Sequence, residues 1–282
     1  MRSFDEQLTI LAEAAFREDI ADGDHSTLAS IEADAKGKAQ LKIKDEGILA
    51  GVKIAESIFF LKEPSARFIA KKADGDPMRH GEIAFEIEAT VYTILGCERV
   101  ILNCMQRMSG IATLTSFYVN KIKGYKSKIL DTRKTTPNFR LLEKEAVRIG
   151  GGHNHRFGLF DMIMLKDNHI EYCGGIRAAI NKAYEYNREL PRPLKIEIET
   201  RSLDEVKQVL HTGKIDRILL DNFSPRQITE ALHLIGGRYE TEASGGINLD
   251  NIEEYAATGV DYISIGALIH QAKSLDLSLK AI

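Results

Sequence analysis

The sequence predicts an α/β protein with an α+β domain first and a parallel (β/α) barrel second. Between residues 38 and 91, apolar and polar residues alternate with a period of two, so this part is predicted to form a largely antiparallel sheet. From Lys128 onward, six short apolar runs alternate with helical patterns, as is typical of a parallel barrel. Residues 97–123 keep helical spacing and are predicted to form a long helix between the domains.

The domain boundaries drawn from these patterns are 1–108 for the first domain and 109–269 for the second. The tail, about 270–282, is expected to pack on the first domain. An amphipathic helix is expected to open the chain, because the apolar residues of 5–17 fall on one helical stripe.

The composition describes a chain with enough apolar residues for sizeable cores and no strong overall charge. The 282 residues are 44% hydrophobic, and the formal net charge of −3 argues against a nucleic-acid-binding surface. The 3 cysteines form no Cys-x-x-Cys pair, as expected in a reducing compartment. We find no signal peptide and no run of about 18 uncharged apolar residues. We therefore expect a cytoplasmic protein without membrane or nucleic-acid partners.

Polar residues follow the predicted barrel strands, each at the point where a strand ends. In a parallel barrel the carboxyl ends of the strands lie on one rim, and that rim carries the active sites of barrel enzymes. A local group of cations on a slightly acidic chain indicates a small anionic ligand. The strand-end residues are Arg133, Lys134, Lys166, Glu199, Asp221, Ser244, Gly245, Gly246 and Gly266.

Two glycine-containing segments, EASGGI and SIGAL, follow the last two predicted strands. Glycine lets backbone N–H groups approach a phosphate closely, and a helix N-terminus adds a favourable dipole. Barrels often carry a phosphate site after their late strands. Ser244, Gly245, Gly246 and Gly266 are therefore predicted to bind phosphate, and the alternative is that the glycines only turn the chain.

Glu199 and Asp221 end successive predicted strands and place two carboxylates on the rim. Carboxylate oxygens bind Mg²⁺, and they also stabilise positive charge that develops on a sugar carbon. Both roles suit glycosyl transfer, and ion pairing with Lys166 or Arg133 is compatible with either. Glu197 shares the strand face of Glu199 and is predicted, as a second choice, to line the interior one layer below.

The segment GGGHNHR places His153 and His155 two residues apart. Zinc needs three or four ligands of known spacing, and no cysteine or carboxylate motif completes such a set here. The neighbouring Arg156 would also repel a dication. We therefore favour hydrogen-bond donation from His155 and Arg156 to carboxylates or phosphates, with the arginine binding in a bidentate manner.

These segments, together with DTRKTTP, IEIET and ILLDN, closely resemble the carboxylating quinolinate phosphoribosyltransferases, also called nicotinate-nucleotide pyrophosphorylases. The resemblance covers most of the chain, including AFREDIADGDHST near its start and ERVILNCMQRMSGIAT in the long helix. DTRKTTP and GGGHNHRFGL are highly specific as a pair, whereas the glycine segments alone are not. One departure is Asn138-Phe139, where the family pattern has Gly-Leu, but asparagine also tolerates a left-handed turn.

The resemblance implies an N-terminal α+β sandwich domain and an incomplete (β/α) barrel of six to seven parallel strands, six being the number counted from the pattern. It implies that quinolinate and phosphoribosyl pyrophosphate react with Mg²⁺ present to give nicotinate mononucleotide, CO₂ and pyrophosphate in de novo NAD biosynthesis. It also implies a homodimer, with a hexamer of dimers left open.

The resemblance further assigns residues of this chain to roles. The basic pocket for the quinolinate carboxylates and the pyrophosphate is implied to contain Arg133, Lys134, His155, Arg156 and Lys166. Arg99 is implied to come from the neighbouring subunit. Glu199 and Asp221 match an acidic pair on the ribose and metal side, where Lys134 assists catalysis. The loops for the 5′-phosphate are implied to contain Ser244, Gly245, Gly246 and Gly266.

Three other functions stay open. Molybdenum-transport-associated homologues share much of the motif set and could use another base. A Schiff-base aldolase would use Lys166 as its nucleophile, and borohydride trapping with a carbonyl substrate would reveal it. A non-catalytic anion-binding protein is disfavoured, because anion binding alone would not call for Glu199 and Asp221 in the site.

Overall fold

The structure, a computed structural model, describes residues 2–282, and its internal contacts divide the chain into two compact units. The first unit comprises the chain up to Ser116, Thr135–Gly151 and Leu268–Ile282. The second comprises Phe117–Lys134 and Gly152–Ala267. The domain boundaries drawn from the sequence stay a prediction, because these units are defined by internal contacts alone.

The first unit is built on an antiparallel sheet of four strands in the order β12-β1-β5-β3, as predicted for this part of the chain. Its strands are β1 (Lys36–Ile43), β3 (Arg67–Ala70), β5 (Ile83–Thr90) and β12 (Leu277–Ala281). Ala39, Leu41 and Ile43 alternate along β1 and are buried in the core. β12 comes from the tail and pairs with β1, so the end of the chain completes this sheet. A separate two-stranded sheet pairs β2 (Gly47–Ile48) with β4 (Pro77–Met78).

The helices of the first unit include α1 (Phe4–Ile20), α2 (His25–Ser30), α3 (Val52–Lys62) and α5 (Arg140–Ile149). Ser3 begins α1 as its N-cap, in a capping box with Glu6. Leu8, Ala12 and Phe16 form the buried stripe of this helix, as predicted. α1 contacts α3 and α5, and α3 in turn contacts β3 of the sheet.

The long predicted helix is α4 (Val91–Lys121), which begins earlier than expected. Thr90 ends β5 and starts the helix at once, because its hydroxyl accepts a hydrogen bond from the Thr93 N–H at 3.2 Å. Gly110 lies midway along α4, and a Cβ at this position would clash with the Lys273 carbonyl, so this position needs glycine for close packing.

The second unit contains a parallel sheet of six strands in the order β6-β11-β10-β9-β8-β7. The strands are β6 (Lys128–Leu130), β7 (Ile163–Leu165), β8 (Ile196–Thr200), β9 (Arg217–Asp221), β10 (Glu240–Ser244) and β11 (Tyr262–Ser264). β6 and β7 are the two edges, so the sheet is an incomplete barrel with the lower of the two expected strand numbers. Leu130 also forms an isolated parallel bridge with His153.

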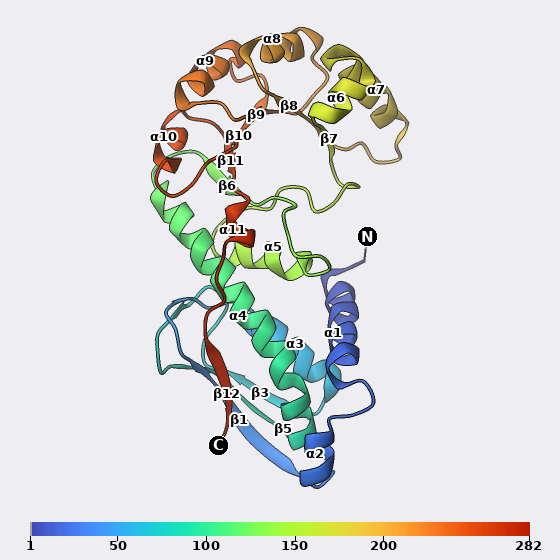
Figure 1. The fold of residues 1–282 in the computed structure, drawn as a ribbon, viewed down its shortest axis with the longest axis vertical. Coiled ribbons are helices and arrows are strands. Elements are labelled where there is room, and N and C mark those ends of the chain that lie inside the picture. The colour runs from blue at the N-terminus through green and yellow to red at the C-terminus, as the bar shows by residue number, and fades with distance from the viewer. Residues whose placement is uncertain (1) are drawn as a thin grey trace. The chain divides into compact units, whose positions relative to one another are not determined.

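Helices alternate with these strands in the chain. They are α6 (Asp167–Cys173), α7 (Ile176–Glu189), α8 (Leu203–Thr212), α9 (Pro225–Ile235) and α10 (Ile252–Ala257), and α11 (Ala267–His270) follows β11. Figure 1 shows α6 to α10 on the outer side of the arc that the strands form. Because all six strands run parallel, their carboxyl ends share one rim.

None of the helices in residues 2–282 is long and apolar enough to span a membrane.

Glu63 connects three elements of the first unit. It follows the C-terminus of α3, and its carboxylate accepts hydrogen bonds from the Thr90 N–H at 2.9 Å and the Thr90 hydroxyl at 2.8 Å. Lys36 Nζ, at the start of β1, lies 2.9 Å from the same carboxylate. Burial alone would raise the pKa of Glu63, but Lys36 and Thr90 lower it to about 2.

We predict that Glu63→Gln lowers the free energy of unfolding at pH 7 by about 1–3 kcal/mol, since it removes an ionic acceptor of several hydrogen bonds. A carboxyl whose folded pKa is lowered from 4.5 to about 2 stabilises the fold above pH 4.5 and loses this effect as the pH falls towards 2. The difference in the free energy of unfolding between wild type and Glu63→Gln should therefore become smaller between pH 5 and pH 2. Urea unfolding at several pH values would measure it. Glu230→Gln, in an exposed pair with Arg226, is the matched control and should change little. A gap that stays constant over this pH range would contradict the prediction.

Candidate active site

The predicted site residues, apart from Arg99, all belong to the second unit. β6 leads into the first cationic segment. Asp131, directly after β6, is fully buried, and its Oδ1 accepts the His155 N–H at 2.8 Å. Arg133 and Lys134 follow and are exposed, with the Lys134 N–H donating to Thr132 Oγ1 at 3.0 Å. Asp131 therefore ties the strand that presents two cations to the segment that carries His155 and Arg156.

Arg156 is a buried cation, only 9% exposed. Its Nη1 lies 3.4 Å from the Met162 carbonyl. Burial, and next the nearby Arg133 charge, lower the pKa of its guanidinium. Two cations that repel each other in this way attract an anion more strongly than either would alone, which suits a ligand with several negative charges.

Lys166 and Glu199 meet across neighbouring strands. Lys166 follows β7, Glu199 lies near the end of β8, and Lys166 Nζ is 3.3 Å from Glu199 Oε2. The Lys166 side chain is 46% exposed and that of Glu199 is 11% exposed. Ion pairing of Glu199 with Lys166 was the structural alternative to a functional role, and the lysine remains accessible enough to serve a ligand as well.

Asp221, at the end of β9, is held by two neighbours. Its Oδ1 accepts the Ser244 hydroxyl at 2.6 Å, and its Oδ2 accepts Asn222 Nδ2 at 2.6 Å. Ser244 lies at the end of β10 and is aligned with Asp221 in the sheet register. Because the Ser244 hydroxyl has one proton and gives it to Asp221, it would have to turn before donating to a phosphate.

The two glycines after Ser244 differ in their surroundings. Gly245 has φ 95°, and a Cβ there would clash with the Asn222 side chain, so this position needs glycine for close packing. Gly246 has φ 64°, and nothing lies within 4 Å of the place a Cβ would take. The backbone at Gly246 thus faces open space, as a phosphate-binding loop requires. Gly266 follows β11 and is half-buried.

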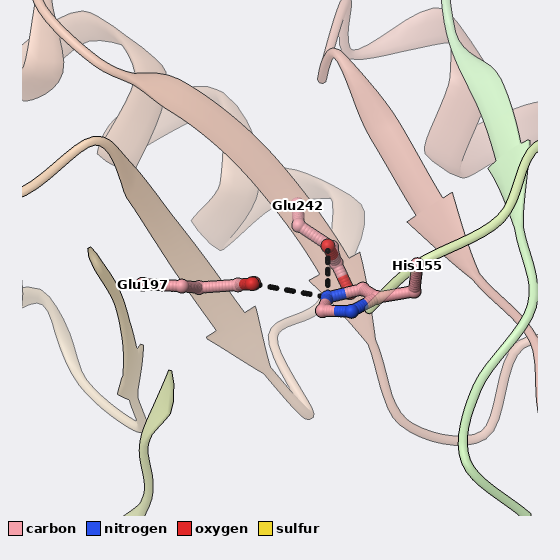
Figure 2. A group of neighbouring side chains, drawn as sticks. All are labelled: His155, Glu197 and Glu242. Carbon is pink, nitrogen blue, oxygen red and sulfur yellow. Dashed lines mark ion pairs between the residues drawn. The ribbon is translucent and has the colours of Figure 1, made fainter. Parts of the chain in front are cut away.

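A buried group of charges lies below this rim. Figure 2 shows the Glu197 and Glu242 carboxylates pointing at the His155 imidazole. His155 Nε2 is 3.0 Å from Glu197 Oε2 and 3.2 Å from Glu242 Oε2, and the His155 side chain is 6% exposed. Arg217 Nη1 lies 3.0 Å from Glu242 Oε2. The second-choice prediction that Glu197 lines the interior fits this position, whereas Glu242 and Arg217 were missed.

The protonation of His155 follows from its neighbours. The Arg156 N–H donates to His155 Nδ1 at 2.7 Å, so that nitrogen is an acceptor. Burial lowers the pKa of His155, and the Glu197 and Glu242 carboxylates raise it, with a net pKa of about 9. Burial, and next the Glu242 charge, raise the pKa of Glu197. Nε2 therefore faces the two carboxylates as a donor, and the contact of Nδ1 with the Arg156 N–H orients that backbone.

One group of side chains in residues 2–282 could hold a metal ion, and it consists of His155, Glu197 and Glu242. Their possible ligand atoms all lie within 4.8 Å of one another. Arg217 already supplies positive charge to this group, and His155 Nε2 carries a proton that faces both carboxylates. The group is therefore better described as a charge-compensated network than as a metal centre. The prediction that His155 donates to a substrate stays a prediction.

Arg99 lies in the first unit, on α4, and is exposed. Its predicted contribution to a site in a neighbouring subunit stays a prediction.

Both parts of the chain match models of one protein family. Residues 24–109 match the model described as quinolinate phosphoribosyl transferase, N-terminal domain, and residues 111–280 match the C-terminal domain of the same enzyme. The chain belongs to the quinolinate phosphoribosyltransferase family. The resemblance inferred from DTRKTTP and GGGHNHRFGL is thereby confirmed.

Individual members of the family align with almost the whole chain. A Bacillus subtilis protein named probable nicotinate-nucleotide pyrophosphorylase (carboxylating) is 42% identical over 273 residues, which are 97% of this chain and 93% of the relative. Quinolinate phosphoribosyltransferase (decarboxylating) 1b of Nicotiana tabacum is 42% identical, covering 94% of this chain and 80% of that protein. The crystal structure of NadC from Streptococcus pyogenes, at 41% identity, superposes with a TM-score of 0.91 over 100% of this chain and 99% of that one.

Proposed function

We propose that this protein transfers the phosphoribosyl group of phosphoribosyl pyrophosphate to quinolinate and decarboxylates the product. The products are nicotinate mononucleotide, CO₂ and pyrophosphate, a step of de novo NAD biosynthesis. The observation that carries the proposal is the family match along 24–280, in which relatives at 42% identity bear these enzyme names. The cationic and acidic side chains at the strand ends supply groups suited to this reaction.

Binding is the first task, because both substrates are anions that repel each other. Arg133, Arg156 and Lys166 bind the two quinolinate carboxylates, with the arginines donating in a bidentate manner. Lys134 and the backbone at Gly245-Gly246 bind the phosphate groups of the second substrate. Holding both substrates in one site converts a bimolecular reaction into an effectively unimolecular one.

The transfer step forms one bond and breaks another. The pyridine nitrogen of quinolinate bonds to the anomeric carbon of the ribose, and the bond from that carbon to pyrophosphate breaks, with the electron pair leaving on the pyrophosphate oxygen. Glu199 and Asp221 stabilise positive charge on the anomeric carbon in the transition state, and Lys134 stabilises negative charge on the leaving group.

Decarboxylation then follows on the same ring. The quaternised nitrogen withdraws electrons from C2, so the bond between C2 and its carboxylate breaks, CO₂ leaves, and C2 takes a proton from water. Arg156 is buried and helps to form a poorly hydrated pocket in which this loss of charge is favourable.

Glu199 and Asp221 also fit a magnesium ion. Both offer carboxylate oxygens at the ends of adjacent strands, and oxygen ligands are the ones that Mg²⁺ prefers. The ion, when bound, neutralises pyrophosphate charge. Asp221 is already oriented by Ser244 and Asn222, as ligand carboxylates commonly are by neighbouring hydrogen-bond donors.

The direct test is to incubate the purified protein with quinolinate, phosphoribosyl pyrophosphate and Mg²⁺, and to measure CO₂ and nicotinate mononucleotide. Equal amounts of the two products are expected, and none after chelation of the metal. A protein that binds both substrates without turnover would be the anion-binding alternative. Borohydride trapping of a carbonyl substrate on Lys166 would favour an aldolase, and turnover of another base in place of quinolinate would favour the molybdenum-transport-associated homologues.

The protein is also proposed to act in the cytoplasm as a homodimer in which each site takes Arg99 from the partner. A two-fold dimer provides such sites in pairs. The exposure of Arg99 on α4 supports this proposal, because the side chain is free to reach a neighbouring molecule.

We predict that Arg99→Ala and Glu199→Gln are each nearly inactive alone but regain activity when the two variants are mixed and exchange subunits. With random pairing about half of the dimers are mixed, and each has one intact site, so about a quarter of wild-type activity should return. The measurement is activity against time after mixing, with exchange verified by tagged subunits. No recovery after verified exchange would exclude sharing of the site through Arg99.

A further inference from the structure

A buried ion pair of the first unit joins segments that adjoin the proposed site in the chain. Glu143 on α5 is fully buried, and its Oε1 accepts hydrogen bonds from Arg107 on α4, from Nε at 3.1 Å and from Nη2 at 3.0 Å. The Arg107 side chain is 23% exposed. Neither residue was singled out by the sequence, and the proposed mechanism does not use them.

Glu143 holds the segment that follows the cationic loop, which is the pair Arg133 and Lys134 after β6. Its Oε2 accepts the Thr136 N–H at 2.8 Å, and its Oε1 accepts the Thr136 hydroxyl at 2.9 Å. Thr136 comes two residues after Lys134 in the chain. The carboxylate thus fixes both polar groups of Thr136 and restricts the backbone that leads away from Arg133 and Lys134.

Arg107 holds the segment that follows the last glycine loop, which is residues 265–266 between β11 and α11. Its Nη1 donates to the Ala272 carbonyl at 2.7 Å, and its Nη2 donates to the Ile269 carbonyl at 2.7 Å. Ile269 belongs to α11, which begins directly after Gly266. The Ile269 carbonyl also accepts the Ala272 N–H at 3.3 Å, so the guanidinium adds a second donor at the end of this short helix, where carbonyls lack the usual helical partners.

We propose that Arg107 and Glu143 are positioning residues that set the geometry of the cationic loop and the last glycine loop together. The inference rests on the proposed function, in which Lys134 binds phosphate groups of the second substrate, and on the prediction from the sequence that Gly266 also binds phosphate. The planar guanidinium of Arg107 bridges the two segments. Nε and Nη2 donate to Glu143, while Nη1 donates to the Ala272 carbonyl and Nη2 also donates to the Ile269 carbonyl. Lysine cannot reproduce this fork.

A purely structural role would give the same contacts but different kinetics. Loss of a structural contact lowers the melting temperature and leaves the kcat of the folded enzyme unchanged. Loss of a positioning contact lowers kcat at temperatures far below melting, because small displacements of catalytic groups reduce the rate steeply. Thr136 is suited to the test, since it is an exposed residue whose substitution should not unfold the protein.

The experiment compares Thr136→Val, which removes the hydroxyl, with Thr136→Ser, which keeps it. We expect Thr136→Val to lower kcat about tenfold, as loss of a hydrogen bond to a charged group would, and Thr136→Ser to stay near wild type. Arg107→Lys should lower kcat by a similar or larger factor. Thr229→Val is the matched control, because its hydroxyl donates only to the Pro225 carbonyl on the surface of α9, and it should leave kcat unchanged.

The double variant Arg107→Lys with Thr136→Val measures the coupling. Because both single changes act through Glu143, the double variant should be little worse than the worse single variant. Wild-type kcat in all variants with lower melting temperatures, or equal losses in the Ser and Val variants, would overturn the inference while the proposed function stands. A wild-type protein that forms no nicotinate mononucleotide would overturn both.

Discussion

Arg156→Ala is expected to raise the KM for quinolinate about tenfold to a hundredfold, because the variant leaves a substrate carboxylate without a charge-assisted hydrogen-bond partner worth about 1.5–3 kcal/mol. Arg133→Ala and Lys166→Ala should act in the same direction. The largest effect is expected at Arg156, since it is 9% exposed and water cannot easily replace it. The Lys166 side chain is 46% exposed, so its loss should be partly compensated by solvent.

The measurement is steady-state kinetics with quinolinate varied at saturating phosphoribosyl pyrophosphate. Arg156→Lys tests the bidentate geometry, because lysine keeps the charge and loses the fork. Arg188→Ala removes an exposed arginine paired with Glu185 and should leave the kinetics unchanged. Nicotinate lacks the second carboxylate and should be a poor substrate. Equal turnover of nicotinate and quinolinate by the wild-type protein would refute the assignment of the basic pocket.

The strand-end residues could be predicted because their arrangement depends on local patterns. A short apolar run followed by charge identifies both the strand and its carboxyl end, and a parallel sheet brings such ends to one rim without further information. Lys166 and Glu199 are 33 residues apart in sequence and meet at 3.3 Å for this reason. Asn138 was expected to tolerate a left-handed turn, and its φ of 62° confirms this.

The buried partners were missed because their pairing is not local. Arg107 and Glu143 are 36 residues apart and lie on helices whose packing no periodicity specifies. Glu242 and Arg217 lie inside strands, where pattern analysis expects apolar residues. A signal did exist, since a charge inside a strand that is otherwise buried needs a partner of opposite charge. Glu197, Arg217 and Glu242 in successive strands could have been paired by that argument alone.

The division into two units also depends on contacts between segments that are distant in sequence, and the order of elements along the chain does not predict these contacts. Residues Thr135–Gly151 follow β6 of the second unit in sequence, yet they belong to the first unit. The ion pair of Glu143 with Arg107 and the contact of α5 with α1 account for this placement. Hydrophobic periodicity identifies α5 as amphipathic but does not say which core its apolar face joins.

Glu199→Gln and Asp221→Asn are each expected to lower kcat about a hundredfold or more while changing the KM for quinolinate little, because these carboxylates act on charge that develops in the transition state. In Asp221→Asn the new NH₂ group would also face either the Ser244 hydroxyl or the Asn222 amide, both of which now donate to the carboxylate. The isosteric changes keep the volume of each side chain, so folding should be preserved.

Steady-state kinetics with each substrate varied in turn would test this, with Glu230→Gln, in an exposed pair on α9, as the control that should match wild type. A titration of Mg²⁺ in both variants would identify the carboxylate nearer the metal, since the variant that loses a ligand should need more of the ion for half-maximal rate. If the variants instead change only the KM for quinolinate, Glu199 and Asp221 bind the acid rather than stabilise the reacting sugar, and the proposed division of the rim into a basic pocket and an acidic pair would be wrong.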